Sequence, residues 1–251
     1  MIKRNYYKVV RVFPDPSSYF YIKNETMSEG QMSFNWSWLD TINLEYSFDK
    51  VNWTLASQLD WSNLKIPADS YVYFRNNSGT FCTSNHDSVL IPFFKVSLGG
   101  DVRTLFNYTD VDSVTAIPDY GLKNLFSFGS GSLGSTEIID ISNLSFRGIT
   151  SIGIEGLYSA FSVQNSKYTK GVDLRDVTTL GERALQYMYS SPSLTEVYAP
   201  NVSTWDTSKT YIWLDGVAPT GVVYKPSTLD IPTNTSSGIP SGWTTQDYPT
   251  I

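Results

Sequence analysis

Apolar and polar residues alternate along the first hundred residues of the chain, in short runs that end at turn-forming residues. The alternation is clearest at residues 31–38, where the four apolar side chains from Met32 to Trp38 are separated by polar ones. Similar runs occupy residues 7–13, 19–22, 44–48, 53–55, 71–75 and 90–96. An apolar residue at every second position points one face of a β-strand into a core. Several short strands with turns between them predict an antiparallel β-sandwich over residues 19–98.

Past Gly100 the pattern changes to a repeated unit. Four segments share the order apolar-x-x-apolar-aromatic, and they occupy residues 102–106, 122–126, 157–161 and 185–189. Side chains three and four positions apart lie on one face of a helical turn. Each of these segments therefore predicts a short helix.

Short strand-like segments follow the later helical ones and repeat one another. They start at Ile139, Val172, Val197 and Val223, which are 33, 25 and 26 positions apart. Repeats of this length predict a solenoid, because stacked units bury apolar faces that one unit alone leaves exposed. The predicted fold class is mainly β with short helices (α+β). It comprises an N-terminal antiparallel β-sandwich at 19–98, a boundary at 97–100, and a short irregular solenoid with a C-terminal cap at 101–251.

One polar residue recurs at the same place in three of these repeats, as Asn143, Asp176 and Asn201. A short amide or carboxylate side chain can hydrogen-bond the backbone of a turn. Stacked repeats would then align the three side chains in a ladder that holds buried backbone groups. The alternative is that Asn and Asp are common in loops and fall in phase by chance.

The first 18 residues are basic, although the chain as a whole is acidic. No acidic residue precedes Asp15. Two interpretations stay open for this segment. It is either a docking arm that adds a strand to the sheet edge of a neighbouring subunit, or the first strand of the sandwich. The side chains of the arm would be Lys3, Arg4, Tyr6, Tyr7, Lys8 and Arg11.

Composition narrows the class of protein. The chain has 251 residues, of which 41% are hydrophobic and 17% charged, so it can bury a core and is not disordered. A formal net charge of −6 argues against a nucleic-acid partner. The single cysteine, Cys82, excludes an intrachain disulfide. The sequence has no signal-peptide pattern and no apolar run of membrane-spanning length, so we expect a protein made without export and without a membrane partner.

Catalytic and metal-binding chemistry has few candidates. His86 is the only histidine, and it shares a polar loop region with Cys82 without an orienting partner. A structural zinc site needs about four Cys or His ligands, and the chain has one of each. Asp110 and Asp112 could coordinate calcium, but a solvated loop explains this pair as well. We therefore predict no enzymatic activity, no cofactor and no metal.

The tryptophans divide between core and surface. Trp36 and Trp53 fall in phase with apolar neighbours, so we expect them in the core. Trp61 is not explained in this way and is a candidate ligand contact. Trp205, Trp213 and Trp243 are expected to close the end of the solenoid, where a terminal coil must be capped.

Three segments together resemble one protein family. They are Leu44–Asp49 running on to Trp53 and Thr54, residues 66–75 with the sequence VYFR at their end, and residues 238–244 with the sequence GIPSGWT. In this order they are similar to the signature of BspA-like leucine-rich-repeat proteins, which gut Bacteroidetes and the crAss-like phages that infect them encode. The resemblance covers most of the chain after about Asn43. It implies a leucine-rich-repeat architecture for the solenoid and supplies no catalytic residue.

The resemblance also implies a role in attachment. Bacterial members of the family act at the cell surface and are exported, whereas a virion protein is assembled in the host cytoplasm and needs no export signal. We therefore expect a non-enzymatic phage virion structural protein: a fibre, collar or decoration component that presents a binding surface for host attachment or assembly. Its expected partners are other virion proteins, further copies of the chain, and a glycan or protein receptor on the host surface. The alternatives are a bacterial cell-surface leucine-rich-repeat adhesin and a carbohydrate-active enzyme.

Overall fold

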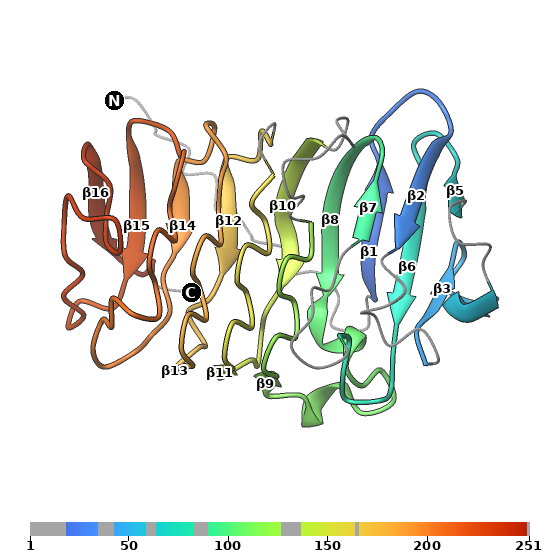
Figure 1. Cartoon of the computed structure of the whole chain (residues 1–251), viewed down its shortest axis with the longest axis horizontal. Coiled ribbons are helices and arrows are strands. Elements are labelled where there is room, and N and C mark those ends of the chain that lie inside the picture. The colour runs from blue at the N-terminus through green and yellow to red at the C-terminus, as the bar shows by residue number, and fades with distance from the viewer. Residues whose placement is uncertain are drawn as a thin grey trace, which may run out of the picture.

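Strands lie side by side along the long axis of the molecule (Figure 1). The fold is given by a computed structural model, which describes residues 19–34, 43–58, 64–82, 90–126, 137–163 and 166–249. This part of the chain contains no helix of seven or more residues. Its short helices are the 3-10 helices η1 (Ala56–Gln58), η2 (Val102–Leu105) and η3 (Val111–Ser113). The structure is therefore mainly β, as the alternation in the sequence predicts.

Two groups of strands follow one another along the chain. The first group is β1 (Phe20–Asn24), β2 (Gly30–Phe34), β3 (Glu45–Ser47), β4 (Thr54–Leu55), β5 (Leu64–Ile66), β6 (Tyr71–Arg75), β7 (Leu90–Pro92) and β8 (Lys95–Asp101). The second group is β9 (Ala116–Ile117), β10 (Glu137–Ser145), β11 (Ser151–Ile152), β12 (Lys170–Asp173), β13 (Thr179–Leu180), β14 (Glu196–Tyr198), β15 (Gly221–Lys225) and β16 (Trp243–Asp247).

The first group pairs in antiparallel fashion and forms parts of two sheets. One sheet has the order β4-β3-β6-β1-β8, and the other has the order β5-β2-β7. In β1, Phe20 and Ile22 are buried, whereas Tyr21 and Lys23 between them are half-buried. β6 shows the same alternation. Each of these strands therefore turns one face into the core and the other toward the surface.

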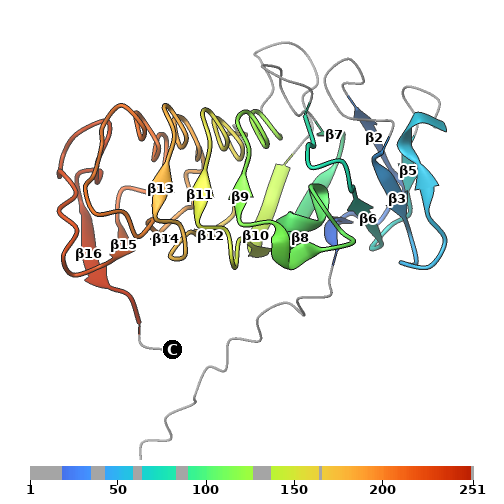
Figure 2. The same cartoon turned by 90° about the horizontal axis from the view of Figure 1, so that it is seen from below.

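From β8 onward the strands pair in parallel. β10 joins the edge of the first sheet by pairing with β8. Beyond it, β12, β14, β15 and β16 form one parallel row, and β9, β11 and β13 form another. Figure 2 shows these as separate rows along the stack. Ser151 pairs with both Ala116 and Thr179, so successive coils of the chain lie on one another in register.

The three later segments predicted to be helices are chains of turns instead. The backbone N–H groups of Tyr120, Leu122 and Asn124 donate to carbonyl groups of the next coil, at 2.7 to 2.9 Å. A helix would direct these groups to its own carbonyls four residues earlier. Tyr120 and Asn124 also have positive φ values of 60° and 51°, which a right-handed helix excludes. The helical prediction therefore holds only for the first segment, where η2 lies.

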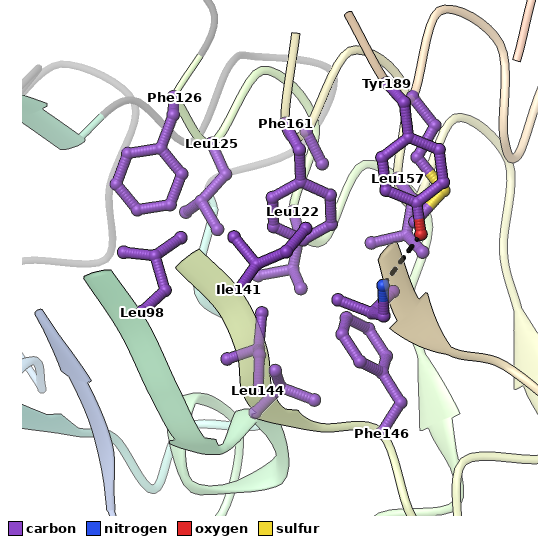
Figure 3. Packing of buried hydrophobic residues seen from close by; sticks show 14 of the residues in the cluster. Leu98, Leu122, Leu125, Phe126, Ile141, Leu144, Phe146, Leu157, Phe161 and Tyr189 are labelled. Atoms are coloured by element: carbon purple, nitrogen blue, oxygen red, sulfur yellow. Dashed lines mark hydrogen bonds between the residues drawn. The ribbon is translucent and has the colours of Figure 1, made fainter. Parts of the chain in front are cut away.

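The apolar positions of these segments are nevertheless buried as predicted. Figure 3 shows residues of the turn segments packed against Leu98 of β8 and Ile141 of β10. All belong to one cluster of buried residues that extends from Phe20 to Trp243. The core is therefore continuous from the antiparallel sheets into the parallel stack. The boundary predicted at residues 97–100 falls inside β8, which pairs with β1 on one side and β10 on the other.

Gly100 allows the close approach of two strands at this junction. Its φ is +83°, and a Cβ atom there would lie 2.0 Å from the carbonyl oxygen of Tyr19. Glycine adopts a positive φ without steric cost, whereas other residues do not. A side chain at this position would push β1 and β8 apart.

The last coils of the chain hold three indole groups. The indole nitrogens of Trp205 and Trp213 donate to the carbonyl oxygens of Ser237 and Gly238, at 2.6 and 2.8 Å. The indole nitrogen of Trp243 donates to the carbonyl oxygen of Ala218, at 2.7 Å. The rings of Trp213 and Trp243 are buried, so these bonds satisfy polar groups inside the core.

Candidate interaction surface

Several residues predicted as functional lie outside the described part of the chain. These are His86, the candidate ligand contact Trp61, and the six side chains of the proposed docking arm, Lys3, Arg4, Tyr6, Tyr7, Lys8 and Arg11. Their roles stay predictions. Cys82 is described: it is buried at 6% exposure and is not part of a disulfide.

The polar residues predicted to form a ladder are all exposed. Asp176 makes the expected kind of bond, because its Oδ2 accepts from the backbone N–H of Gly148 in the preceding coil, at 3.0 Å. The side chains of Asn143 and Asn201 make no hydrogen bond to another described residue. Asn201 is held by its backbone instead, which donates to Val177 at 2.7 Å. The three side chains therefore do not bond the coils as a set.

Threonine hydroxyls link successive coils just before the strands of the β9-β11-β13 row. Thr150 Oγ1 donates to the carbonyl oxygen of Thr115, and Thr178 Oγ1 donates to that of Thr150, both at 3.2 Å. The backbone N–H of each donates to the same carbonyl at 2.8 Å. The recurrence of Thr just before each strand of the β9-β11-β13 row is the sequence signal that could have identified this ladder.

The candidate calcium ligands are used otherwise. Asp112 Oδ1 lies 3.2 Å from Nη1 of Arg103, so its partner is a guanidinium. Among the described residues, no three His, Cys, Asp or Glu side chains gather as a metal site would require.

Aromatic side chains gather on the outer face of the first sheet. Tyr21 of β1 pairs across the strands with Tyr73 of β6, and Tyr71 lies two residues before Tyr73 on the same face. The ring centre of Tyr21 is 5.3 Å from that of Tyr71 and 6.0 Å from that of Tyr73, with steep angles between the planes. The rings of Tyr71 and Tyr73 are nearly parallel, with centres 6.0 Å apart. We call these three residues the tyrosine trio.

The position of Tyr21 depends on a glycine in the neighbouring strand. A Cβ atom at Gly99 would lie 2.2 Å from the Tyr21 hydroxyl oxygen, so the ring lies across the bare backbone of β8. Burial, followed by the nearby Tyr71 and Asp140, raises the pKa of Tyr21 to about 12. Burial also raises the pKa of Tyr73. Both hydroxyls therefore stay protonated near neutral pH and can donate hydrogen bonds.

Two lysines flank the trio in different electrostatic states. Lys23 Nζ lies 5.8 Å from the ring centre of Tyr71 and forms ion pairs with Asp69 and Glu25, at 2.9 and 3.0 Å. These carboxylates raise the pKa of Lys23, with the hydrogen bond to Asp69 contributing most. Lys50 is exposed, and its Nζ lies 4.6 Å from the ring centre of Tyr73. It forms no ion pair with any residue that the structure describes.

A second aromatic group surrounds Arg75 beside the trio. The guanidinium carbon is 3.9 Å from the ring centre of Trp53 and 4.1 Å from that of Tyr108. Arg75 Nε also donates to Oε2 of Glu45 at 2.7 Å. The prediction that Trp53 lies in the core is wrong: it is half-buried on this outer face, where its ring packs against Tyr19 and Arg75. We use the name aromatic face for the tyrosine trio and Lys50 together with Arg75, Trp53 and Tyr108.

The parallel row carries a similar arrangement. Tyr198 of β14 and Tyr224 of β15 are register partners, and their rings stack with centres 4.7 Å apart. The guanidinium carbon of Arg175 lies 4.9 Å from the ring centre of Tyr198, and Arg175 is also paired with Asp173 at 2.9 Å. Every charge in this group is compensated within the chain, so the group stabilises the row more than it offers a site.

The aromatic face could have been found in the sequence from its phase. Tyr21 alternates with Phe20 and Ile22, and Tyr73 alternates with Val72 and Phe74. In an antiparallel sheet that packs only one face on a core, the second phase of each strand faces the surface even when it is aromatic. Such a face can supply large rigid contact area with polar tips.

Comparisons with other proteins add no assignment to this face. Within the residues described, no helix has the length and hydrophobicity needed to cross a lipid bilayer. No family model matches the chain, and no curated protein and no solved structure matches it either.

Proposed function

We propose that this chain is a non-catalytic structural protein of a phage particle and that the aromatic face is its binding surface. The observation that carries the proposal is the face itself. Tyr71 is 38% exposed, and Phe48 and Val51 in the adjacent β3–β4 turn are 44% and 77% exposed. Exposed apolar groups that lie together, beside charged groups, mark surfaces that contact other molecules. Tyr, Trp and Arg are the residue types that contribute most to such contacts.

The face is not required for the core, which supports a role in binding. Phe20, Ile22 and Phe74 fill the inner side of the same strands and are fully buried. The tyrosines on the outer side pack mainly on one another. Aromatic groups gain modest stability from such packing, about 0.5–1.5 kcal/mol for each pair. This gain is small beside the burial of the inner side chains, so the outer rings are not what mainly holds the strands together.

The arrangement of the strands supports a carrier role for the rest of the molecule. We propose that the sheets of the first group form a β-sandwich and that the parallel coils form a short leucine-rich-repeat solenoid. Coils in register give a stiff, elongated body, since each coil contacts only its neighbours. Such a body holds a binding face at a fixed distance from an attachment point. This suits a fibre, collar or decoration protein, and the resemblance to the BspA-like family favours a phage or surface setting.

Cell fractionation tests this proposal directly. An antibody raised against the purified full chain is used on three fractions of an infected culture: density-purified particles, cell envelopes and cytosol. We expect the chain in the particle fraction, with immunogold label on intact particles. Recovery in the envelope fraction of uninfected cells would favour a bacterial surface adhesin instead. Recovery only in the cytosol would overturn both.

A further inference from the structure

We propose that the tyrosine trio and Lys50 bind a glycan that contains hexuronic acid residues. This inference rests on the proposed function, because it takes the aromatic face to be a binding surface and names what it binds. The four side chains come from two adjacent strands and the turn beside them, so the sheet fixes their spacing.

The rings supply the apolar part of such a site. One face of a pyranose ring carries mainly C–H groups, which pack well against an aromatic ring. Tyr71 is the most exposed of the trio, and its ring is nearly parallel to that of Tyr73 at 6.0 Å. Tyr21 stands nearly perpendicular to Tyr71, at 78° between the planes. The trio therefore offers an exposed ring for stacking and an upright ring beside it that limits how a sugar can lie.

The hydroxyl groups supply polar contacts. A tyrosine hydroxyl is protonated at neutral pH, and burial raises the pKa of Tyr21 and Tyr73 further above that range. Each can therefore donate to a sugar hydroxyl and accept from another. A site with large apolar surfaces and a few fixed polar groups is the usual form of a small-ligand site.

Lys50 determines the charge of the ligand. Its ammonium group lies over the Tyr73 ring and forms no ion pair with a carboxylate of the described residues. The nearest acidic neighbour in sequence, Asp49, accepts hydrogen bonds from Val51 and Asn52 in its own turn. An ammonium–carboxylate hydrogen bond is stronger than one between neutral groups. In a hexuronic acid the carboxylate is attached directly to the pyranose ring, so a sugar stacked on Tyr71 can place it near Lys50.

Other ligand classes fit the face less well. A nucleic acid would also stack on tyrosines, but its phosphates need several cations along a groove. Among the described residues of the face, Lys23 and Arg75 already have carboxylate partners, which leaves Lys50 for a single carboxylate. A neutral sugar would leave Lys50 without a role. An apolar peptide would leave the Tyr21 and Tyr73 hydroxyls without partners.

Calorimetric titration of the full chain tests the inference. The probes are a galacturonic acid trisaccharide, the same trisaccharide with its carboxyl groups reduced, and sialyllactose. We expect the galacturonic acid trisaccharide to bind at least tenfold more tightly than its reduced form. We expect Lys50→Gln to remove that difference and Tyr71→Ala to abolish binding of both. The control is Lys65→Gln on the other sheet, where Lys65 is 63% exposed and paired with Glu29, and it should change nothing.

Each contrary result has a distinct meaning. Equal binding of the acidic and reduced trisaccharides would overturn the role of Lys50 and the acidic ligand. Preference for sialyllactose would overturn the assignment to hexuronic acid. Failure of all three probes to bind, with the chain still present in purified particles, would refute this inference and leave the proposed function standing. A circular dichroism melt of each variant confirms that it is folded.

Discussion

The ion pair between Asp101 and Arg103 lies where the antiparallel sheets meet the parallel stack, and removing it tests how that junction is held. Arg103 Nη2 lies 2.7 Å from Asp101 Oδ2, and Arg103 Nε bonds both carboxylate oxygens, at 3.0 and 3.1 Å. The two side chains are only 7% and 3% exposed. Asp112, which also contacts Arg103, is 96% exposed.

These exposed fractions decide how much free energy of unfolding each substitution should remove. Arg103→Met keeps most of the side-chain volume but leaves the Asp101 carboxylate buried with one remaining donor, the backbone N–H of residue 103. Removing one partner of a buried ion pair typically costs about 3–5 kcal/mol, because an uncompensated charge stays behind. Asp112→Asn removes a contact in water, which is worth about 0–1 kcal/mol.

Urea denaturation followed by tryptophan fluorescence measures both changes, provided that the slope of the free energy against urea is unchanged. The double variant Asp101→Asn with Arg103→Met should recover part of the loss, since it leaves no buried charge. The reasoning fails if Arg103→Met costs less than about 1 kcal/mol, or if Asp112→Asn costs as much as Arg103→Met.

Three further predictions concern single side chains. Gly100→Ala should lower the free energy of unfolding by about 2 kcal/mol or more, because of strain at its positive φ and the clash with Tyr19. Gly99→Ala should cost less, because it displaces only the hydroxyl end of Tyr21. Thermal melts compare the two variants. Hydrogen bonds from Lys167, and then from Lys95, lower the pKa of Glu137. The stability that Glu137 adds is therefore present above its ordinary pKa of 4.5 and should be lost as the pH falls further. In urea titrations, the difference in unfolding free energy between the wild type and Glu137→Gln should shrink in acid. Tyr189→Phe should cost about 1–3 kcal/mol and speed amide exchange at Val172, whose N–H donates to the buried Tyr189 hydroxyl at 3.0 Å; unchanged exchange would count against that bond.

The core could be predicted from the sequence because burial follows local periodicity. Phe20, Ile22, Val72 and Phe74 alternate with polar or aromatic residues, and all four are fully buried. The apolar residues of the turn segments are buried for a different reason. A spacing of three and four residues also fits consecutive tight turns, so the pattern cannot distinguish such turns from a helix. The distinction depends on where the backbone N–H groups bond. Leu122, Leu157 and Leu185 donate to carbonyl groups of another coil, which are 34, 27 and 24 residues away in sequence.

The candidate surface was harder to predict, because its members are far apart in the sequence. Tyr21 and Tyr73 are brought together only by the pairing of β1 with β6. The relevant property of Lys50 is that it forms no ion pair with a carboxylate of the described residues, and this too depends on the fold. The order Asp49-Lys50 in the sequence does not show whether the two side chains pair. In the folded turn Asp49 accepts from the backbone N–H groups of Val51 and Asn52, and no ion pair joins it to Lys50.

Parallel stacking in register gives a physical reason why aromatic residues occur in columns in this molecule. A tyrosine at the same position in successive coils must lie next to its counterpart. Tyr158 meets Tyr187 edge to face, and Tyr187 meets Tyr211 in the same way, with ring centres 5.7 and 6.1 Å apart. The antiparallel trio is different, because its rings come from positions that no repeat relates: Tyr21 lies on β1, and Tyr71 and Tyr73 lie on β6. Repetition is therefore sufficient to explain the columns of the stack. The trio has no such explanation from repetition, and this contrast is why we assign binding to the trio and structural support to the columns.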